Sequence, residues 1–227
     1  MAEVNRRELD TTLYLVADVD SCGERGVTET VRFAVEGGVT AVQLRDHRAT
    51  ARELLHSARE LRELLEGTAV CFIVNDRLDV ALAAGADGVH LGQSDLPAGA
   101  AREIAGPEFV IGWSVTNLAE AEAARALPPG TVDYFGVGPV YPTGTKLDAA
   151  PPIGVRDLQA ICGSSSVPCV AIGGITADRV AELVDTGVTG IAVVAAICSA
   201  DDPLAAAMEL RRRCAGSPRA RRRRIAR

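Results

Sequence analysis

Short apolar runs alternate with longer amphipathic segments along almost the whole chain. The short runs are continuously apolar and rich in β-branched residues, which is typical of parallel strands buried on both faces. The predicted strands are Leu13–Ala17, Ala41–Leu44, Cys71–Val74, Gly88–Leu91, Val110–Trp113, Tyr134–Val137, Cys169–Ile172 and Gly190–Val194. The segments between them predict helices near 27–37, 50–66, 77–85, 97–105, 117–126, 152–162, 177–186 and 203–214.

Several of these helices have recognisable start signals. Thr50 is followed three residues later by Glu53, the spacing of a capping box. Thr176 precedes an amphipathic segment, and Asp202 precedes Pro203 at a first helical position. Helices are therefore expected to begin after these three residues.

Eight strand–helix units in strict alternation predict a fold of the α/β class, a single (β/α)₈ TIM barrel. A doubly wound open sheet is the alternative, but no G-x-G-x-x-G follows the first predicted strand. We assign 1–10 to an N-terminal extension, 11–215 to the TIM-barrel catalytic domain and 216–227 to a disordered Arg-rich tail.

Composition limits the possible binding partners of the protein and its cellular compartment. The 227 residues carry a net charge of −6, and without the six arginines of 216–227 the rest carries −12, which disfavours a nucleic-acid partner. No apolar run reaches the ~18 residues of a membrane helix, and the first residues show no signal-peptide core. The six scattered cysteines contain no C-x-x-C pair. These features predict a cytoplasmic protein with no membrane partner.

Polar residues gather where the predicted strands end. QLRDH, NDR, HLGQSD, WS, GPVYPTGTK and IGGIT each follow or finish a strand. The C-terminal ends of barrel strands build the active sites of this architecture. We therefore expect an active site at that end of the barrel.

Two carboxylates among these residues suggest a metal site. Asp76 and Asp95 follow neighbouring predicted strands, near Asn75 and Gln93. Hard oxygen ligands of this kind suit Mg²⁺, which usually bridges one or two carboxylates to substrate phosphates. The alternative is structural: Asp76 caps a helix and Asp95 belongs to a turn.

Other strand ends are suited to anions. Gly173-Gly174 before a helix, and the end of the last strand, match the usual phosphate site of such barrels. Thr143 and Thr145 add hydroxyl groups, and Arg45 and Lys146, the only lysine of the chain, add positive charge. His90 is either a base or a structural residue of the barrel interior. With no Ser-His-Asp set, the predicted catalysis is electrostatic rather than covalent.

Taken in order, QLRDH, NDRLDVALAAGADGVHLGQSD, DYFGVGPVYPTGTK, VAIGGIT and GIAVVAAI resemble the thiamine-phosphate synthase family from about residue 13 to about residue 213. The resemblance implies a (β/α)₈ barrel that joins 4-amino-2-methyl-5-hydroxymethylpyrimidine diphosphate to a thiazole monophosphate, carboxylated or not, and releases pyrophosphate with the help of Mg²⁺. Its partners would then be these small molecules.

The resemblance also assigns roles by position. Gln43 would contact the pyrimidine, and Asp76 and Asp95 would bind Mg²⁺. The pyrophosphate contacts would be Arg45, Asn75, Ser114 and Lys146, of which Arg45, Ser114 and Lys146 are the catalytic candidates. The thiazole phosphate would meet Thr143, Thr145, Gly173 or Gly174, Val194 and Ala195. The substrate-binding segments further include Leu44, Asp46, His47 and Gly144.

Two positions depart from the family pattern. His47 stands where the family usually has lysine, which predicts weaker or more pH-dependent pyrophosphate binding. Ala195 stands where the family often has serine, a modest loss of one hydrogen bond. A thiazole tautomerase and a non-catalytic binding protein are the alternative functions, and homo-oligomer formation is left open.

Overall fold

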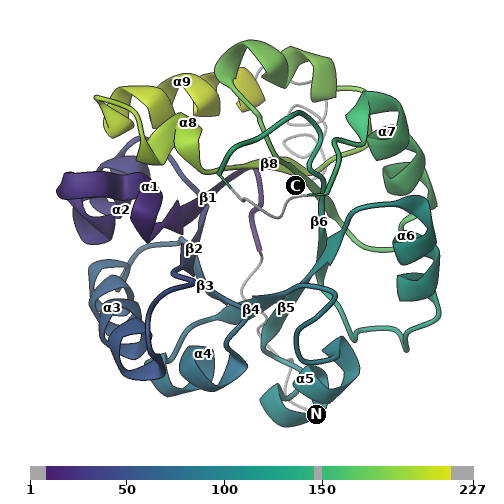
Figure 1. The fold of residues 1–227 in the computed structure, drawn as a ribbon, viewed down its shortest axis with the longest axis horizontal. Coiled ribbons are helices and arrows are strands. Elements are labelled where there is room, and N and C mark those ends of the chain that lie inside the picture. Colours follow the sequence, from purple (N-terminus) through teal and green to yellow (C-terminus); the bar gives the residue numbers. More distant parts are fainter. Residues whose placement is uncertain (1–8, 146–149, 216–227) are drawn as a thin grey trace.

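Parallel strands form the centre of the molecule. The computed structural model describes residues 9–145 and 150–215. Within them β1 to β8 pair in chain order, and β8 returns to β1 to close a barrel (Figure 1). The strands are β1 (Leu13–Asp18), β2 (Ala41–Arg45), β3 (Cys71–Asn75), β4 (Gly88–Leu91), β5 (Val110–Val115), β6 (Tyr134–Val137), β7 (Cys169–Ile172) and β8 (Gly190–Val193). The predicted (β/α)₈ barrel is confirmed.

Helices surround the barrel on its outside (Figure 1). They follow the strands in the order α1 (Val19–Cys22), η1 (Gly23–Arg25), α2 (Val27–Glu36), α3 (Ala51–Leu64), α4 (Leu78–Ala84), α5 (Ala98–Ala105), α6 (Leu118–Arg125), α7 (Gly154–Ser164), η2 (Ala177–Leu183), α8 (Ala195–Cys198) and α9 (Pro203–Ala215). The predicted tail, 216–227, and residues 1–8 of the predicted extension lie outside the described residues.

Helices begin directly after all three predicted start residues. Thr50 and Glu53 form the complete capping box of α3, and the Asp202 carboxylate accepts a hydrogen bond from the N–H of Ala205 at 2.9 Å. The helix predicted near 177–186 is observed as the 3₁₀ helix η2, which ends earlier, at Leu183. Its Thr176 hydroxyl donates to the Asp178 carboxylate at 2.6 Å and does not cap the backbone.

The short helices α1 and α8 were not predicted. Each has four residues, too few for a periodicity of 3.6 residues to show in the sequence. Both follow a strand at the C-terminal end of the barrel.

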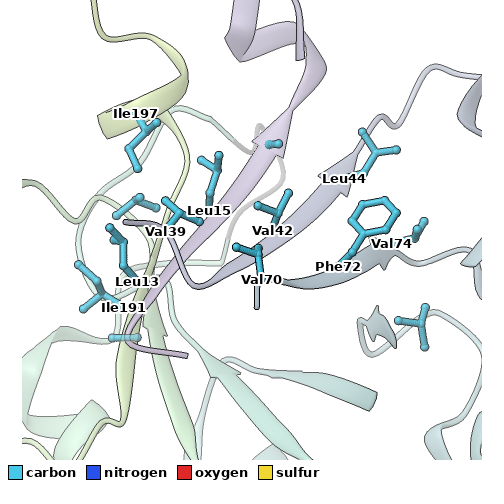
Figure 2. Close-up of a cluster of buried hydrophobic side chains, with 14 of the residues drawn as sticks. Leu13, Leu15, Val39, Val42, Leu44, Val70, Phe72, Val74, Ile191 and Ile197 are labelled. Carbon is cyan, nitrogen blue, oxygen red and sulfur yellow. The ribbon is translucent and has the colours of Figure 1, made fainter. Parts of the chain in front are cut away.

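Successive strand residues are buried on opposite faces, as the continuous apolar runs predicted. Leu13 and Leu15 of β1 lie in the large cluster between strands and helices, together with Phe72 (Figure 2). Tyr14 and Val16, the alternate residues, lie in a second cluster. That second cluster draws on strands across the barrel, including β6 and β7, and so fills its interior. The interior contains both apolar side chains and two tyrosines.

Candidate active site

The C-terminal ends of the strands form one rim, because all strands run in the same direction. Arg45 ends β2, Asn75 ends β3, and Ser114 lies near the end of β5. The strand register places Asn75 level with His90 of β4. The fold therefore brings candidate residues from distant parts of the chain to the same rim.

Arg45 is held by a carboxylate that the sequence reading missed. A guanidinium nitrogen of Arg45 pairs with Asp18, whose side chain is 3% exposed, while that of Arg45 is 18% exposed. Asp18 also accepts hydrogen bonds from the backbone N–H and hydroxyl of Ser21, at 3.0 and 2.8 Å. Moving the Arg45 guanidinium away would leave the buried Asp18 carboxylate without its cation, which is costly. Asp18 therefore fixes the position of the Arg45 side chain. The only signal was an acidic residue directly after an apolar strand.

The loop after β2 uses Asp46 to shape its own backbone. The Asp46 carboxylate accepts the N–H groups of Arg48 and Ala49, each at 3.0 Å. The Leu44 side chain is fully buried in the helix-facing cluster (Figure 2). Of these two predicted substrate contacts, Asp46 is therefore already engaged in a turn, and Leu44 points its side chain away from the barrel interior.

His47 lies beside an acidic residue of helix α1. Its Nε2 is 3.9 Å from a carboxylate oxygen of Asp20, which also pairs with Arg48 at 3.2 Å. The side chain of His47 is half exposed. The residue that stands in place of the expected lysine thus has a carboxylate as its neighbour.

The two candidate metal ligands follow adjacent strands. Asp76 has a positive φ of 61°, rare for a residue with a side chain, and its N–H donates to the carbonyl of His90 at 2.8 Å. The helix that follows, α4, has Arg77 at its N-cap position, without a cap from the side chain of that residue. The Asp95 carboxylate does belong to a turn, where it accepts the N–H of Gly92 at 2.6 Å.

These residues fit a magnesium ion better than a metal that needs a full protein cage. In the described residues, no group of three or more His, Cys, Asp or Glu side chains could hold a metal. Mg²⁺ keeps several waters and needs only one or two carboxylates with substrate phosphates. Asp76 and Asp95, on loops after neighbouring strands, supply that number.

The exit of β6 and the turn after β7 run side by side. The N–H of Val140 donates to the carbonyl of Ile172 at 2.8 Å, and that of Tyr141 to Gly173 at 3.1 Å. Gly173 and Gly174 both have positive φ, 96° and 64°, which only glycine adopts at little cost. The two glycines therefore turn the backbone sharply at the rim, where its N–H groups can meet an anion.

Three side chains hold this turn from the outside. A guanidinium nitrogen of Arg179 donates to the carbonyl of Gly174 at 2.7 Å, and the guanidinium carbon lies 4.5 Å from the centre of the Tyr141 ring. The Tyr141 hydroxyl donates to Glu182 at 2.9 Å. This link between the β6 exit and η2 was not predicted, since its members are far apart in sequence.

The threonines after β6 lie in a tight turn around Gly144. The N–H of Thr145 donates to the hydroxyl of Thr143 at 3.3 Å. Lys146, predicted to contact the pyrophosphate, lies outside the described residues. Thr143 and Thr145 therefore end the described part of this segment.

The last strand leads into the single turn of α8. The carbonyl of Val194 accepts the N–H groups of Ile197 and Cys198, at 3.0 and 2.9 Å. The first N–H groups of any helix have no partner within it. The backbone at Ala195 can therefore offer donors to an anion without the hydroxyl that this residue lacks.

A continuous hydrogen-bond chain crosses the barrel interior below the rim. Gln43 Nε2 donates to the Tyr14 hydroxyl at 2.8 Å, and the Tyr14 and Tyr134 hydroxyls are 2.8 Å apart. Tyr134 is 3.0 Å from His90 Nδ1, and His90 Nε2 is 3.0 Å from Ser114 Oγ. Both nitrogens of His90 are engaged, so its structural interpretation is favoured over that of a base.

Two further properties concern the helices and the cysteines of the described residues. No helix among them has both the length and the apolar character that a membrane crossing requires. None of the six cysteines, all in the described part of the chain, forms a disulfide bond.

The fold and rim define the class of protein: a (β/α)₈ barrel whose strand ends combine carboxylates, an arginine and glycine-rich turns. Residues 13–197 match the family described as thiamine monophosphate synthase. The chain therefore belongs to the thiamine monophosphate synthase family, transferases of thiamine synthesis, as the resemblance predicted.

Individual relatives support this assignment. The chain is 46% identical to the thiamine-phosphate synthase of Albidiferax ferrireducens over 88% of this chain and 90% of the relative. It is 48% identical to that of Azorhizobium caulinodans over 89% and 94%. A solved structure of thiamine phosphate pyrophosphorylase from Pyrococcus furiosus is similar with a TM-score of 0.83 and 41% identity, covering 94% of this chain and all of the other.

Proposed function

We propose that the chain condenses 4-amino-2-methyl-5-hydroxymethylpyrimidine diphosphate with 4-methyl-5-(2-phosphoethyl)thiazole to give thiamine monophosphate and pyrophosphate. With the carboxylated form of the thiazole, the same products form and the carboxyl group leaves as CO₂. The observation that carries the proposal is the family match over nearly the whole barrel. A rim that combines two carboxylates, an arginine and glycine turns supports it. A thiazole tautomerase would have no use for the metal-site carboxylates. The six thiols without disulfides favour a cytoplasmic setting.

The diphosphate would bind along the ends of β2 to β5. Arg45, anchored by Asp18, would bind the pyrophosphate with Asn75 and Ser114, and Lys146 would add a second cation. Asp76 and Asp95 would hold Mg²⁺, which supplies positive charge against the leaving pyrophosphate. Gln43, 4% exposed at the base of the rim, would contact the pyrimidine.

The thiazole phosphate would bind at the opposite side of the rim. Its phosphate would meet the backbone N–H groups at Gly173-Gly174 and Val194-Ala195, and the hydroxyls of Thr143 and Thr145. Glycine turns and first helical turns present several N–H groups to one anion. This arrangement would align the thiazole nitrogen with the pyrimidine CH₂ group.

The reaction would be a dissociative substitution. The bond between the pyrimidine CH₂ carbon and the diphosphate oxygen breaks, and its electron pair leaves with the pyrophosphate. The 4-amino-pyrimidine ring stabilises the resulting cation, and the thiazole nitrogen then forms the new C–N bond with its lone pair. No general base is needed, so the residues act by charge stabilisation and alignment.

Incubating the purified chain with both substrates and Mg²⁺ tests the proposal. Pyrophosphate and thiamine monophosphate should form in equal amounts and only when both substrates are present. A tautomerase or a non-catalytic binder would release no pyrophosphate, and that result would overturn the proposal.

Variants test the metal site in the same assay. Asp76→Asn and Asp95→Asn should each lower kcat/KM on the order of 100-fold and raise the Mg²⁺ concentration needed for half-maximal rate. Asp157→Asn, on the exposed outer face of α7, is the matched control and should retain activity. Full activity of both metal-site variants, or activity that survives a chelator, would refute the assigned metal site.

A further inference from the structure

Three interior residues have no role in the proposed chemistry. Tyr14 and Tyr134 are each 1% exposed, and His90 lies between Tyr134 and Ser114. Burying a phenol hydroxyl is costly unless it is hydrogen-bonded. Apolar side chains could fill the barrel interior without this cost in free energy. A polar chain at this place therefore calls for a reason beyond packing.

One end of the hydrogen-bond chain has a fixed donor. Gln43 Nε2 has only protons to give, so the Tyr14 hydroxyl accepts at that end. Either tyrosine hydroxyl could donate to the other, but a Tyr14 proton given to Tyr134 leaves each buried hydroxyl with an acceptor inside the hydrogen-bond chain. In that direction Tyr134 donates to His90 Nδ1, and His90 Nε2 carries the ring proton and donates to Ser114 Oγ.

Two glycines provide the room for this chain. Gly112 lies between His90 and Tyr134 in the strand register. A Cβ at Gly112 would lie 2.3 Å from the Tyr134 hydroxyl and 2.4 Å from His90 Nδ1. A Cβ at Gly136 would lie 2.9 Å from the His90 ring. The bond between Tyr134 and His90 thus passes through space that any other residue at Gly112 would occupy.

Burial keeps the chain protonated. It raises the pKa of Tyr14 and holds the pKa of Tyr134 well above its ordinary range, because ionised phenols lose their hydration there. Both hydroxyls therefore keep the protons that define the direction of the chain.

We propose that Tyr14, Tyr134 and His90 are positioning residues. The two tyrosines hold His90 as the Nε2–H tautomer, and His90 then donates to Ser114, so that the Ser114 hydroxyl proton is left to donate to the diphosphate. The proposal rests on the proposed function for the identity of that anion. Ser114 Oγ accepts from His90, and its single proton then serves an acceptor outside the chain. At the other end, Gln43 keeps its side-chain oxygen as an acceptor for the pyrimidine amino group.

Nitrogen NMR of the wild-type protein tests the direction without any substrate. The protein has three histidines. The NMR signals of His90 are assigned by their loss in His90→Gln. We expect an unprotonated Nδ1 and a protonated Nε2 at neutral pH. The opposite tautomer would show that the donors and acceptors of the hydrogen-bond chain are reversed, and this result would overturn the inference.

The Tyr134→Phe variant tests the cause. It removes the hydroxyl and keeps the ring, so His90 should lose its tautomer preference and show a mixture. His56, exposed on α3, is the internal reference and its signals should not change. An unaltered His90 tautomer in a folded variant would contradict the assigned role of Tyr134.

Kinetics separate positioning from stability. Tyr134→Phe should lower kcat/KM for the pyrimidine diphosphate roughly tenfold, with little change in KM for the thiazole phosphate. The double variant Tyr134→Phe/Ser114→Ala should be no slower than Ser114→Ala, because Tyr134 acts only through Ser114. Additive losses would refute this route.

The two proposals fail in different ways. If the wild-type tautomer is as expected and no pyrophosphate forms, the proposed function is wrong and the directional chain stands. If pyrophosphate forms and the tautomer is reversed, the synthase stands and the positioning role is wrong. Because the NMR test measures the tautomer in the wild-type protein, it does not depend on whether Tyr134→Phe folds.

Discussion

Gly173 shows how one residue can shape the rim. Its φ is 96°, and a Cβ there would lie 2.4 Å from the Cβ of Pro139 and 3.2 Å from the backbone nitrogen of Val140. The conformation and the space both exclude a side chain. The close contact of the β6 exit with the β7 turn therefore depends on the missing Cβ.

Gly173→Ala should damage stability and thiazole-phosphate binding together. The positive φ alone costs an alanine about 1–2 kcal/mol, and the contact with Pro139 adds to this cost, so thermal unfolding should occur several degrees lower. KM for the thiazole phosphate should rise because the N–H groups of the turn move. Gly163→Ala in α7, where a Cβ meets nothing within 4 Å, is the control and should be neutral or slightly stabilising. Equal melting temperatures for the two variants would contradict this explanation.

At the scale of elements, the Tyr141 side chain ties the β6 exit to η2. Burial, followed by the hydrogen bond to Glu182, raises the pKa of Tyr141 from 10.0 to about 12. The folded state thus favours the protonated phenol more than the unfolded chain does. The stabilisation is fully present below pH 10 and is lost as the pH rises toward 12.

Tyr141→Phe should be less stable than the wild type at neutral pH, by about 1 kcal/mol for one hydrogen bond to a carboxylate near the surface. The difference in unfolding free energy should shrink as the pH rises from 10 toward 12, because ionised Tyr141 no longer donates to Glu182. Denaturant unfolding of both proteins over this pH range measures the effect. A difference that stays constant with pH would show that the hydrogen bond contributes nothing.

At the scale of the whole molecule, the barrel closes where β8 meets β1. A Cβ at Gly190 would lie 1.7 Å from the carbonyl oxygen of Thr11 and 2.9 Å from the Cα of Thr12. The N–H of Ile191 donates to the carbonyl of Thr12 at 3.4 Å, and the hydroxyls of Thr11 and Thr189 are 3.0 Å apart. The first and last strands can approach only because position 190 has no side chain.

Gly190→Ala should therefore destabilise the closed barrel more than Gly173→Ala does, by 4 kcal/mol or more as a rough estimate for overpacking against backbone. Soluble yield and melting temperature measure the effect. Gly99→Ala in α5, with open space around its Cβ position, is the matched control. A Gly190→Ala protein as stable as this control would show that the strands can shift apart at low cost.

Much of the architecture could be predicted because it depends on local patterns. The bounds of β4, β6 and β7 were predicted as observed, since short apolar runs end at glycine or polar residues. The strand ends with polar residues were predicted to meet at one rim, which follows from parallel pairing alone. The functional roles of those residues stay predictions for the assays above.

The features that could not be predicted depend on contacts between distant positions. The position of Asp18 after an apolar strand does not indicate that it pairs with Arg45, and the sequence does not indicate that Arg179 holds the turn at Gly174. The hydroxyls of Tyr14 and Tyr134 meet although the residues are 120 positions apart. The closed barrel brings side chains of this kind together, and the residues next to them in the sequence do not indicate the pairing.

By itself, the sequence determined the order of strands and helices, the barrel that this order implies, the family and the polar strand ends. These follow from periodicity and local motifs, which act over a few residues. Only the tertiary structure decided which side chains share the barrel interior and how the hydrogen bonds from Gln43 to Ser114 are connected. The reason is geometric, because closing eight strands into a barrel brings their alternate residues together. Whether a side chain could fit at Gly112 or Gly190 depends on the atoms of the neighbouring strands.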